Sequence, residues 1–238
     1  MVRSGTPRTS ENLPLVLASG AAGLALSLLG AAFGSTPSGL PLAYALLGFG
    51  GVVLYVRWYS RLGRTPSAAL RVGAPLPEFQ LEDENGRPLS SAAFRGRPAV
   101  FLFHRGNWCP LCMAQIRELV EEYKELEARG AQVALVSPQS LEHTRALAAR
   151  FDVPFRFLVD PGARAARQLG ILHEAGVPLG MRGYDADTVF PSAIVTDAEG
   201  RILLADQTDN YRVRPEPWTF LAAIDGATAV DASTPRRA

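Results

Sequence analysis

The sequence is poor in the residues that build metal centres and nucleic-acid surfaces. It has two cysteines, Cys109 and Cys112, and three histidines, none of which lies at metal-ligand spacing from another. The formal net charge is only +1, so charge gives no argument for binding nucleic acid. We therefore expect no metal ion, no other cofactor and no nucleic-acid partner.

Charged residues are missing altogether from residues 13 to 56. At about 1.5 Å per residue, this run is roughly twice as long as one crossing of a hydrocarbon core of about 30 Å requires. The run must fold back on itself, and residues 34–39 are the obvious turn because they combine glycine, serine and proline. We predict two membrane-spanning helices, at residues 13–33 and 40–56.

Arginines flank this run at both ends, and the turn between the two spans has none. They are Arg3 and Arg8 before the first span and Arg57, Arg61 and Arg64 after the second. The positive-inside rule then places both ends of the hairpin, and the chain that follows it, on the cytoplasmic side of an integral membrane protein. A secretory signal peptide over residues 13–33 is the rival interpretation, and Glu11 and the length of the apolar run argue against it.

The composition divides the chain into five parts. They are a cytoplasmic segment at 1–12, a transmembrane hairpin at 13–58, a linker at 59–70, a globular domain at 71–224 and a disordered tail at 225–238. The globular part has about 155 residues, which is enough for one complete hydrophobic core.

Apolar runs and amphipathic segments alternate along the globular part. We predict strands at residues 79–81, 99–103, 132–136, 155–159, 192–196 and 201–205. Helices are predicted from the two cysteines to Ala128 and at residues 141–151, 163–169 and 217–224. Residues 176–189 have no clear period and should form an irregular loop over one edge. Strands and helices in alternation indicate an α/β fold with a layered sheet.

The two cysteines stand between a predicted buried strand and the start of a helix, in the order Trp-Cys-Pro-Leu-Cys. Free N–H groups and the positive end of the helix dipole favour a thiolate at that position, so one cysteine should be unusually nucleophilic. Three interpretations are open: a redox-active dithiol, half of a zinc site, or two inert packing residues. The Trp-Cys-x-x-Cys context favours the redox dithiol, and the lack of a second cysteine pair argues against zinc.

Several stretches resemble, in order, the AhpC/TSA peroxiredoxin-like family. They are residues 73–75 with 79–81, 105–112, 136–138, 159–162 and 195–202. The resemblance covers roughly residues 73–205 and implies a thioredoxin-like fold, a central mixed sheet flanked by helices. It also implies an antioxidant, thiol-dependent oxidoreductase.

The dithiol loop departs from the peroxidase pattern of this family, Pro-x-x-x-Thr-x-x-Cys. In that register Cys112 takes the place of the cysteine that attacks peroxide, Cys109 that of the threonine and Arg105 that of the proline. The family also carries an arginine just before a late strand, where it helps hold the peroxide, and Pro191 stands there instead.

Thioredoxin-like reductases have a cis-proline at that same place, so the Phe190–Pro191 bond is a candidate cis peptide. An ordinary trans proline at a strand start is the alternative. The buried acid of thioredoxins, which would fall near Phe103, is absent. Proton transfer in a reductase therefore has no obvious base.

Six residues are the predicted site: His104, Arg105, Trp108, Cys109, Cys112 and Pro191. His104 is a candidate for proton relay or thiolate stabilisation, or else a loop histidine bonded to the backbone. Arg105 is a candidate to hold a thiolate or a peroxide oxygen, or else a solvated loop residue. Trp108 is expected to pack over the dithiol and shield it.

Three functions follow from these residues. In the first, Cys109 attacks a protein disulfide or small oxidant and Cys112 resolves the mixed disulfide. In the second, a cysteine attacks a hydroperoxide, Cys112 by the peroxiredoxin register or Cys109 by exposure, and its neighbour condenses with the sulfenic acid. Either enzyme needs a thiol reductant of the thioredoxin or glutathione kind. The third function is a membrane-tethered redox sensor or assembly factor.

Overall fold

The computed structural model describes residues 10–34 and 39–233, and these form two compact units. One unit contains Thr65–Thr208 together with the chain from Arg214 onward. The other contains the described residues up to Arg64 and, in addition, Asp209–Val213. The predicted boundary between hairpin and globular domain therefore misses one segment, because five residues far along the chain fold with the hairpin.

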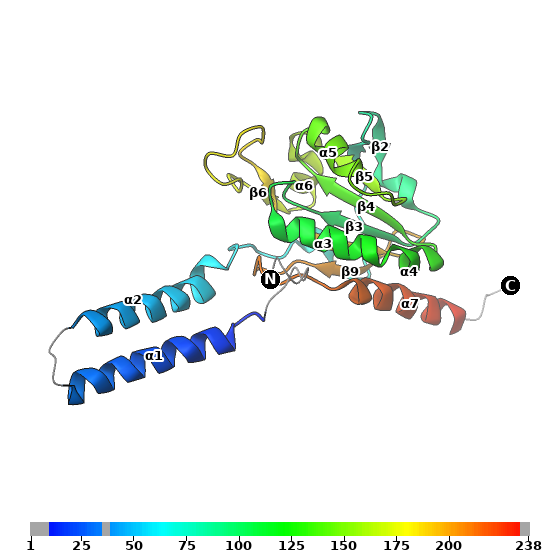
Figure 1. Ribbon diagram of the computed structural model, residues 1–238. Coiled ribbons are helices and arrows are strands. Elements are labelled where there is room, and N and C mark those ends of the chain that lie inside the picture. The colour runs from blue at the N-terminus through cyan, green and yellow to red at the C-terminus, as the bar shows by residue number, and fades with distance from the viewer. Residues whose placement is uncertain (1–9, 35–38, 234–238) are drawn as a thin grey trace. The chain divides into compact units, whose positions relative to one another are not determined.

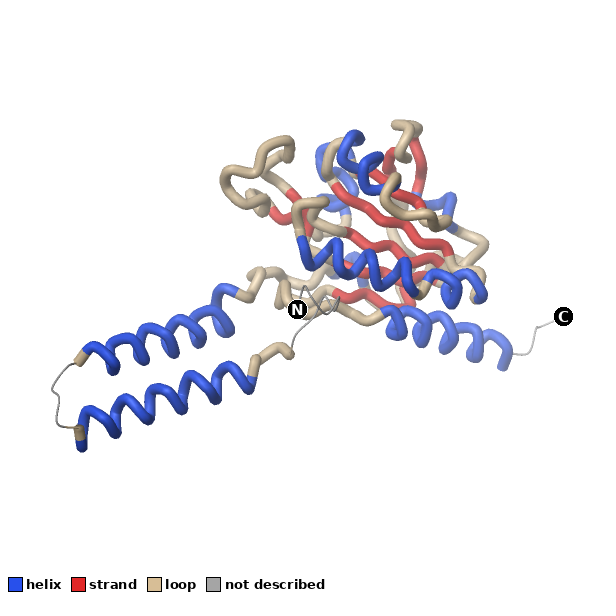
Figure 2. The backbone as a smooth tube through the Cα atoms, in the orientation of Figure 1, coloured by secondary structure: helices blue, strands red, loops and turns tan. Residues whose placement is uncertain are grey.

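The larger unit is built on a seven-stranded mixed sheet in the order β2-β1-β5-β4-β3-β8-β9 (Figures 1 and 2). Its strands are β1 (Gln80–Glu82), β2 (Pro88–Ser90), β3 (Ala99–Phe103), β4 (Gln132–Ser137), β5 (Arg156–Val159), β8 (Ser192–Thr196) and β9 (Ile202–Asp206). β3, β4 and β5 run parallel, and β8 and β9 are antiparallel additions beside β3. Two short strands, β6 (Leu172–His173) and β7 (Thr188–Val189), pair separately.

Strand β3 is at the centre of the core because all five of its side chains are apolar and buried. Successive side chains of a strand point to opposite faces, so β3 contributes to two hydrophobic clusters. Phe101 and Phe103 belong to the cluster that contains α6 (Arg164–Gln168) and the segments before β3. Val100 and Leu102 belong to the cluster that contains both cysteines and Phe220.

The helices of this unit follow the predicted order. They are α3 (Pro110–Glu121), α4 (Tyr123–Ala128), α5 (Leu141–Ala148), α6 and α7 (Pro217–Ser233), with short 3-10 turns η2 (Ala68–Leu70), η3 (Ser91–Phe94) and η4 (Pro161–Ala163). The single helix predicted up to Ala128 is interrupted at Glu122, whose φ of −96° and ψ of 11° leave the helical region. Gly130, with φ of +68°, follows α4, as expected for a glycine after a helix end.

The last predicted helix is wrong at its end, and one strand was not predicted. α7 continues to Ser233, whereas we expected it to end at Ile224 and a disordered tail to begin at Asp225. Residues 225–233 contain three alanines, which favour a helix. The prediction from composition treated this stretch as part of a disordered tail. Residues 234–238 lie outside the described part. β2 was not predicted, since its three residues begin with a proline, a residue confined to sheet edges.

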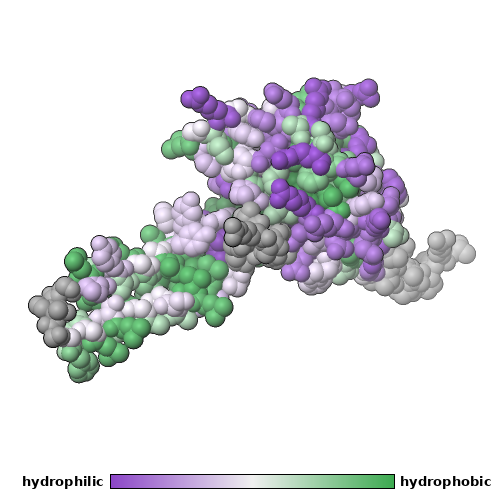
Figure 3. Space-filling model, in the orientation of Figure 1, coloured by the Kyte–Doolittle hydropathy of each residue, from purple (hydrophilic) through white to green (hydrophobic). Residues whose placement is uncertain are grey.

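The smaller unit is a helical hairpin of α1 (Pro14–Phe33) and α2 (Leu40–Leu54), and α2 continues into a π-helical turn, η1 (Tyr55–Tyr59). None of the side chains of α1 or α2 is buried, and Figure 3 shows apolar groups spread over both helices. Pro14–Phe33 and Leu40–Tyr59 are long and apolar enough to cross a membrane. Most of the predicted turn, residues 35–38, lies outside the described residues.

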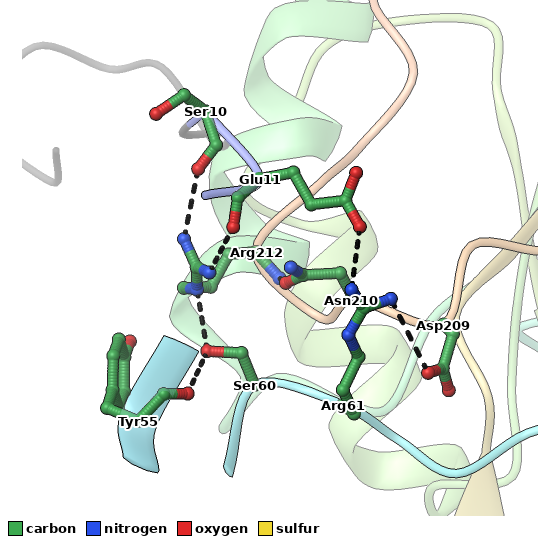
Figure 4. Close-up of polar contacts among 8 residues, drawn as sticks. All are labelled: Ser10, Glu11, Tyr55, Ser60, Arg61, Asp209, Asn210 and Arg212. Atoms are coloured by element: carbon green, nitrogen blue, oxygen red, sulfur yellow. Dashed lines mark hydrogen bonds and ion pairs between the residues drawn. The ribbon is translucent and has the colours of Figure 1, made fainter. Parts of the chain in front are cut away.

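Residues Asp209–Val213, here named the clasp segment, hold the two ends of the hairpin together (Figure 4). The buried guanidinium of Arg212 donates hydrogen bonds to the Ser60 hydroxyl at 2.8 Å, the Ser10 carbonyl at 3.2 Å and the Glu11 carbonyl at 2.8 Å. The same guanidinium lies 5.4 Å from the centre of the Tyr55 ring. One side chain thus donates hydrogen bonds to acceptors on both ends of the hairpin.

A second arginine strengthens this contact from the hairpin side. Arg61 forms ion pairs with Glu11 at 3.0 Å and with Asp209 at 3.9 Å. Both pairs are partly exposed, so each is expected to contribute less than about 1 kcal/mol. Tyr55 and Tyr211 add a hydroxyl-to-hydroxyl hydrogen bond of 2.8 Å. The clasp segment is therefore held mainly by buried Arg212.

Removing residues 1–62 is expected to leave the sheet folded, because every residue of the two clusters lies between Leu70 and Ile224. The clasp segment, however, loses the partners of Arg212. Trypsin should therefore cut after Arg212 roughly ten times faster in the truncated chain than in the full chain. The bond after Arg214 precedes Pro215 and resists trypsin, so the mass of the fragment identifies the site. Equal protection of both chains, or loss of the folded sheet, would contradict this account.

Candidate active site

The loop after β3 carries the cysteine pair to the edge of the sheet. The pairing of β3 with β4 continues for one residue past the strand, since the His104 N–H donates to the Val136 carbonyl at 2.9 Å. The chain then turns through residues 105–108, and α3 begins at Pro110 with Cys109 as its N-cap. Proline at the first helical position favours this start, because its missing N–H would have no partner within the helix.

Cys109 and Cys112 are free thiols on the first turn of α3. The Cys109 sulfur accepts a hydrogen bond from the Cys112 backbone N–H at 3.3 Å, so the sulfur acts as the helix cap. Cys109 is 5% exposed and Cys112 is 1% exposed. Both thiols are thus largely enclosed, and Cys109 is the more accessible of the two.

The surroundings push the pKa values of the two thiols in opposite directions. A hydrogen bond from the Cys112 side chain, helped by the charges of Arg214 and Arg105, lowers the pKa of Cys109 to about 6 against the opposing effect of burial. Burial, and then the neighbouring Cys109, hold the pKa of Cys112 well above its usual range. These shifts favour a Cys109 thiolate beside a protonated Cys112 at neutral pH, and a thiolate is a far stronger nucleophile than a thiol.

Arg105 and Trp108 lie beside this pair. The Arg105 guanidinium stands 4.7 Å from the centre of the Trp108 ring, a cation–π contact, and donates a hydrogen bond to the Gly176 carbonyl. Trp108 is partly buried and packs against the hydrophobic cluster that contains both cysteines. Gly106 makes this packing possible, because a Cβ atom there would lie 2.8 Å from the indole nitrogen of Trp108.

His104 is buried next to the loop, with 2% of its surface exposed. Burial lowers the pKa of its imidazole to about 3, so the ring is neutral at physiological pH. A neutral ring does not stabilise a thiolate as a cation would. Its use as a proton relay stays a prediction, and its Nδ1 atom makes no hydrogen bond within the described residues.

Pro191 lies at the start of β8, and the structure contradicts one expectation about it. The Phe190–Pro191 bond is trans, so the candidate cis-proline is wrong. A trans proline is common at the start of a strand. A cis peptide bond before proline, by contrast, usually belongs to a tight turn. Pro191 nevertheless lies with Gln115 and Arg214 around a gap too narrow for a water molecule, at the end of the sheet where the dithiol lies.

Several residues that hold the dithiol loop belong to no motif. The Asn107 backbone N–H donates to the Gln139 side chain at 2.9 Å, and the Asn107 amide donates to the His143 carbonyl at 2.7 Å. The Thr188 hydroxyl donates to the Arg105 carbonyl at 2.8 Å. Glutamine and threonine are common surface residue types, so nothing in the sequence pattern marks Gln139 or Thr188, although both are buried in the structure. The irregular loop predicted at 176–189 is thus tied to the dithiol loop through Arg105.

Among the described residues, the cysteines have no metal-ligating side chains grouped with them. Within residues 10–34 and 39–233, no three side chains of histidine, cysteine, aspartate or glutamate form a group that fits a metal ion. The arrangement is suited to chemistry at sulfur, with an activated thiolate and a protonated thiol on one helical turn.

The fold and the cysteine pair define a class, that of thioredoxin-like α/β domains with a dithiol at the start of a helix. The chain belongs to the AhpC/TSA family: residues 72–205, more than half of the sequence, match the model of that family. The family resemblance drawn from the motifs is therefore confirmed.

Curated relatives include chloroplastic peroxiredoxin Q proteins of two plants. The protein of Sedum lineare is 32% identical over 117 residues, which is 45% of this chain and 63% of the relative. The protein of Populus jackii is 29% identical over 112 residues, 47% of this chain and 53% of the relative. The chain thus spans less than two thirds of the length of either relative.

Two solved structures share the fold. AhpC of Enterococcus faecalis superposes with a TM-score of 0.57 at 17% identity, covering 70% of this chain and 98% of that protein. Peroxidoxin BcpB from Mycobacterium tuberculosis gives 0.54 at 21% identity, covering 66% and 97%. These likenesses confirm the predicted thioredoxin-like fold.

Proposed function

We propose that this protein is a thiol-dependent peroxidase in which Cys109 attacks a hydroperoxide and Cys112 resolves the product. The observation that carries the proposal is the Cys109 sulfur at the N-cap of α3, bonded to the Cys112 N–H and bearing a lowered pKa. Family membership and the peroxiredoxin Q relatives support peroxide as the oxidant.

The chemistry uses only the two sulfurs and an external reductant. The Cys109 thiolate attacks the terminal peroxide oxygen, the O–O bond breaks, and the departing alkoxide takes a proton from water to leave as an alcohol. Cys109 is then a sulfenic acid. The Cys112 thiol condenses with it, releasing water and forming the Cys109–Cys112 disulfide. A thiol reductant of the thioredoxin or glutathione kind reduces this disulfide and restores both thiols.

The geometry favours Cys109 over Cys112 as the attacking residue. The peroxiredoxin register would give Cys112 that role, but Cys112 is almost fully enclosed and its pKa is raised, so it is protonated at neutral pH. A protonated thiol is a weak nucleophile. The departure from the Pro-x-x-x-Thr-x-x-Cys pattern therefore goes with an exchange of roles, in which the residue at the threonine position attacks.

Disulfide reduction by the same dithiol is the second candidate. The specific observation in its favour is the Cys-x-x-Cys spacing on one helical turn, with an activated first cysteine and a protonated second cysteine. In this reaction Cys109 attacks a protein disulfide, and Cys112 displaces the partner. Both candidates end in the same intramolecular disulfide.

Parallel stopped-flow measurements separate the candidates. The reduced full chain is mixed with hydrogen peroxide, an organic hydroperoxide and a protein disulfide, and tryptophan fluorescence follows oxidation near Trp108. The proposal expects at least one peroxide to react faster than the disulfide by roughly a hundredfold or more. A faster reaction with the disulfide would favour the second candidate, and slow reaction with all three would favour a redox sensor.

We also propose that α1 and α2 anchor the chain in a membrane with the dithiol domain on the cytoplasmic side. The long apolar helices and the flanking arginines support this placement. A fluorescent reporter that folds only in the cytoplasm, fused after Ala238, should be bright in membrane fractions. Strong activity of a phosphatase reporter that works only outside the cytoplasm would contradict the orientation.

A further inference from the structure

We propose that Arg214 is a positioning residue for the Cys109 thiolate and replaces the arginine that the family carries where this chain has Pro191. The inference rests on the proposed thiol chemistry of Cys109. It assigns the positive charge of the site to a residue about twenty positions beyond the expected one, in the connection between β9 and α7.

The topology of the sheet brings Arg214 to the dithiol. β3 ends at Phe103, directly before the dithiol loop, and Phe103 is paired with Ser192 at the start of β8. β9 runs antiparallel to β8, so its last residue, Asp206, returns to that same end and pairs with Ala193. Arg214 lies in the connection that leaves β9 at this end of the sheet.

The residues around a gap too narrow for a water molecule support this placement. Arg214 lines it together with Pro191 and Ser192 from the start of β8, Leu102 from β3 and Gln115 from α3. Gln115 lies one helical turn beyond Cys112, so one wall of this gap comes from the helix that carries the dithiol. Arg214 is 4% exposed, so its charge is poorly screened by water. Pro191, at the family's arginine position, and Arg214 thus border the same space.

The charges around the dithiol favour Arg214 over the alternatives. Arg214 lowers the pKa of both cysteines, and its effect on Cys109 exceeds that of Arg105. Arg105 is more exposed and donates to the Gly176 carbonyl outside the dithiol. His104 is neutral at physiological pH. The hydrogen bond from Cys112 has the largest effect on the pKa of Cys109, and of the two arginine charges Arg214 contributes more than Arg105.

The test is a titration of the thiolate absorbance at 240 nm in the reduced full chain, held in dodecyl maltoside micelles. Arg214→Gln removes the charge and keeps hydrogen-bond donors, so the midpoint for Cys109 should rise by about one pH unit, a tenfold weaker acid. Arg214→Lys restores the charge and should return most of that shift. Arg117→Gln, an exposed arginine on the same helix as the dithiol, is the matched control and should leave the midpoint unchanged.

A midpoint in Arg214→Gln equal to that of the wild type, or an equal rise in Arg214→Lys, would overturn the proposal. Circular dichroism shows whether each variant is folded. If Arg214→Gln does not fold, Arg214→Lys decides: a midpoint near that of the wild type supports the proposal, and a rise of about one unit overturns it. A wild-type midpoint near that of a free cysteine would instead contradict the proposed function itself.

Discussion

Cys109→Ser is expected to abolish peroxide consumption, and Cys112→Ser is expected to retain the first attack. The reason is the division of roles on one helical turn: Cys109 carries the lowered pKa and Cys112 stays protonated. Loss of the nucleophile should reduce the rate by at least roughly a thousandfold, the scale expected when a covalent catalyst is removed. Cys112→Ser should stop after one turnover with a sulfenic acid on Cys109, or with a trapped mixed disulfide when the substrate is a disulfide.

Peptide mass analysis after one equivalent of peroxide and a sulfenic-acid reagent checks both variants. The matched control is Glu121→Gln, because Glu121 is exposed at the last residue of α3, at the opposite end of that helix from the cysteines. It should behave as the wild type in the trapping assay. A reversed pattern, with Cys109→Ser active and labelled on Cys112, would restore the peroxiredoxin register and contradict the exchange of roles.

The reactivity of Cys109 is expected to be near its maximum at pH 7 and to fall about tenfold for each pH unit below 6. Its pKa is lowered to about 6, and the reactive thiolate is the deprotonated form, present above the pKa and lost below it. A free cysteine with a pKa of about 8.5 is only a few per cent thiolate at pH 7, so the thiolate fraction of Cys109 should be roughly thirty times higher.

The measurement is the rate of iodoacetamide alkylation between pH 4 and 9, with a small-molecule thiol as the reference. One inflection near pH 6 is expected. No second inflection near pH 6.5 should arise from His104, because burial lowers the pKa of its ring to about 3. A single inflection near pH 8.5 would show that the helix start and its charges do not activate this sulfur.

The local sequence pattern predicted the central strands and the start of α3 well. The five apolar residues of β3 and the five residues of β8 were found at their observed bounds, because a fully buried strand is a short apolar run with clear ends. The start of α3 was equally clear, since proline follows the N-cap there. These features depend on neighbouring residues alone, which is why the sequence indicates them.

Features that join distant parts of the chain were not predictable in this way. The clasp segment folds with the hairpin although about 150 residues separate Arg212 from Ser60, and its buried guanidinium has no sequence signature. Arg214 looked like one of many arginines. The expected cis-proline followed from a family comparison and not from the residues, and the peptide is trans. Each of these features depends on contacts between residues that are far apart in the chain. Such contacts leave no periodic pattern in the sequence.

The most direct test of the central assignment is competitive labelling of the reduced full chain with a limiting amount of iodoacetamide at pH 7. Peptide mass analysis then measures the adducts on each cysteine. The Cys109 thiolate and the enclosed, protonated Cys112 predict a ratio of roughly ten to one or more in favour of Cys109. Equal labelling, or preferential labelling of Cys112, would contradict the assignment of Cys109 as the attacking cysteine.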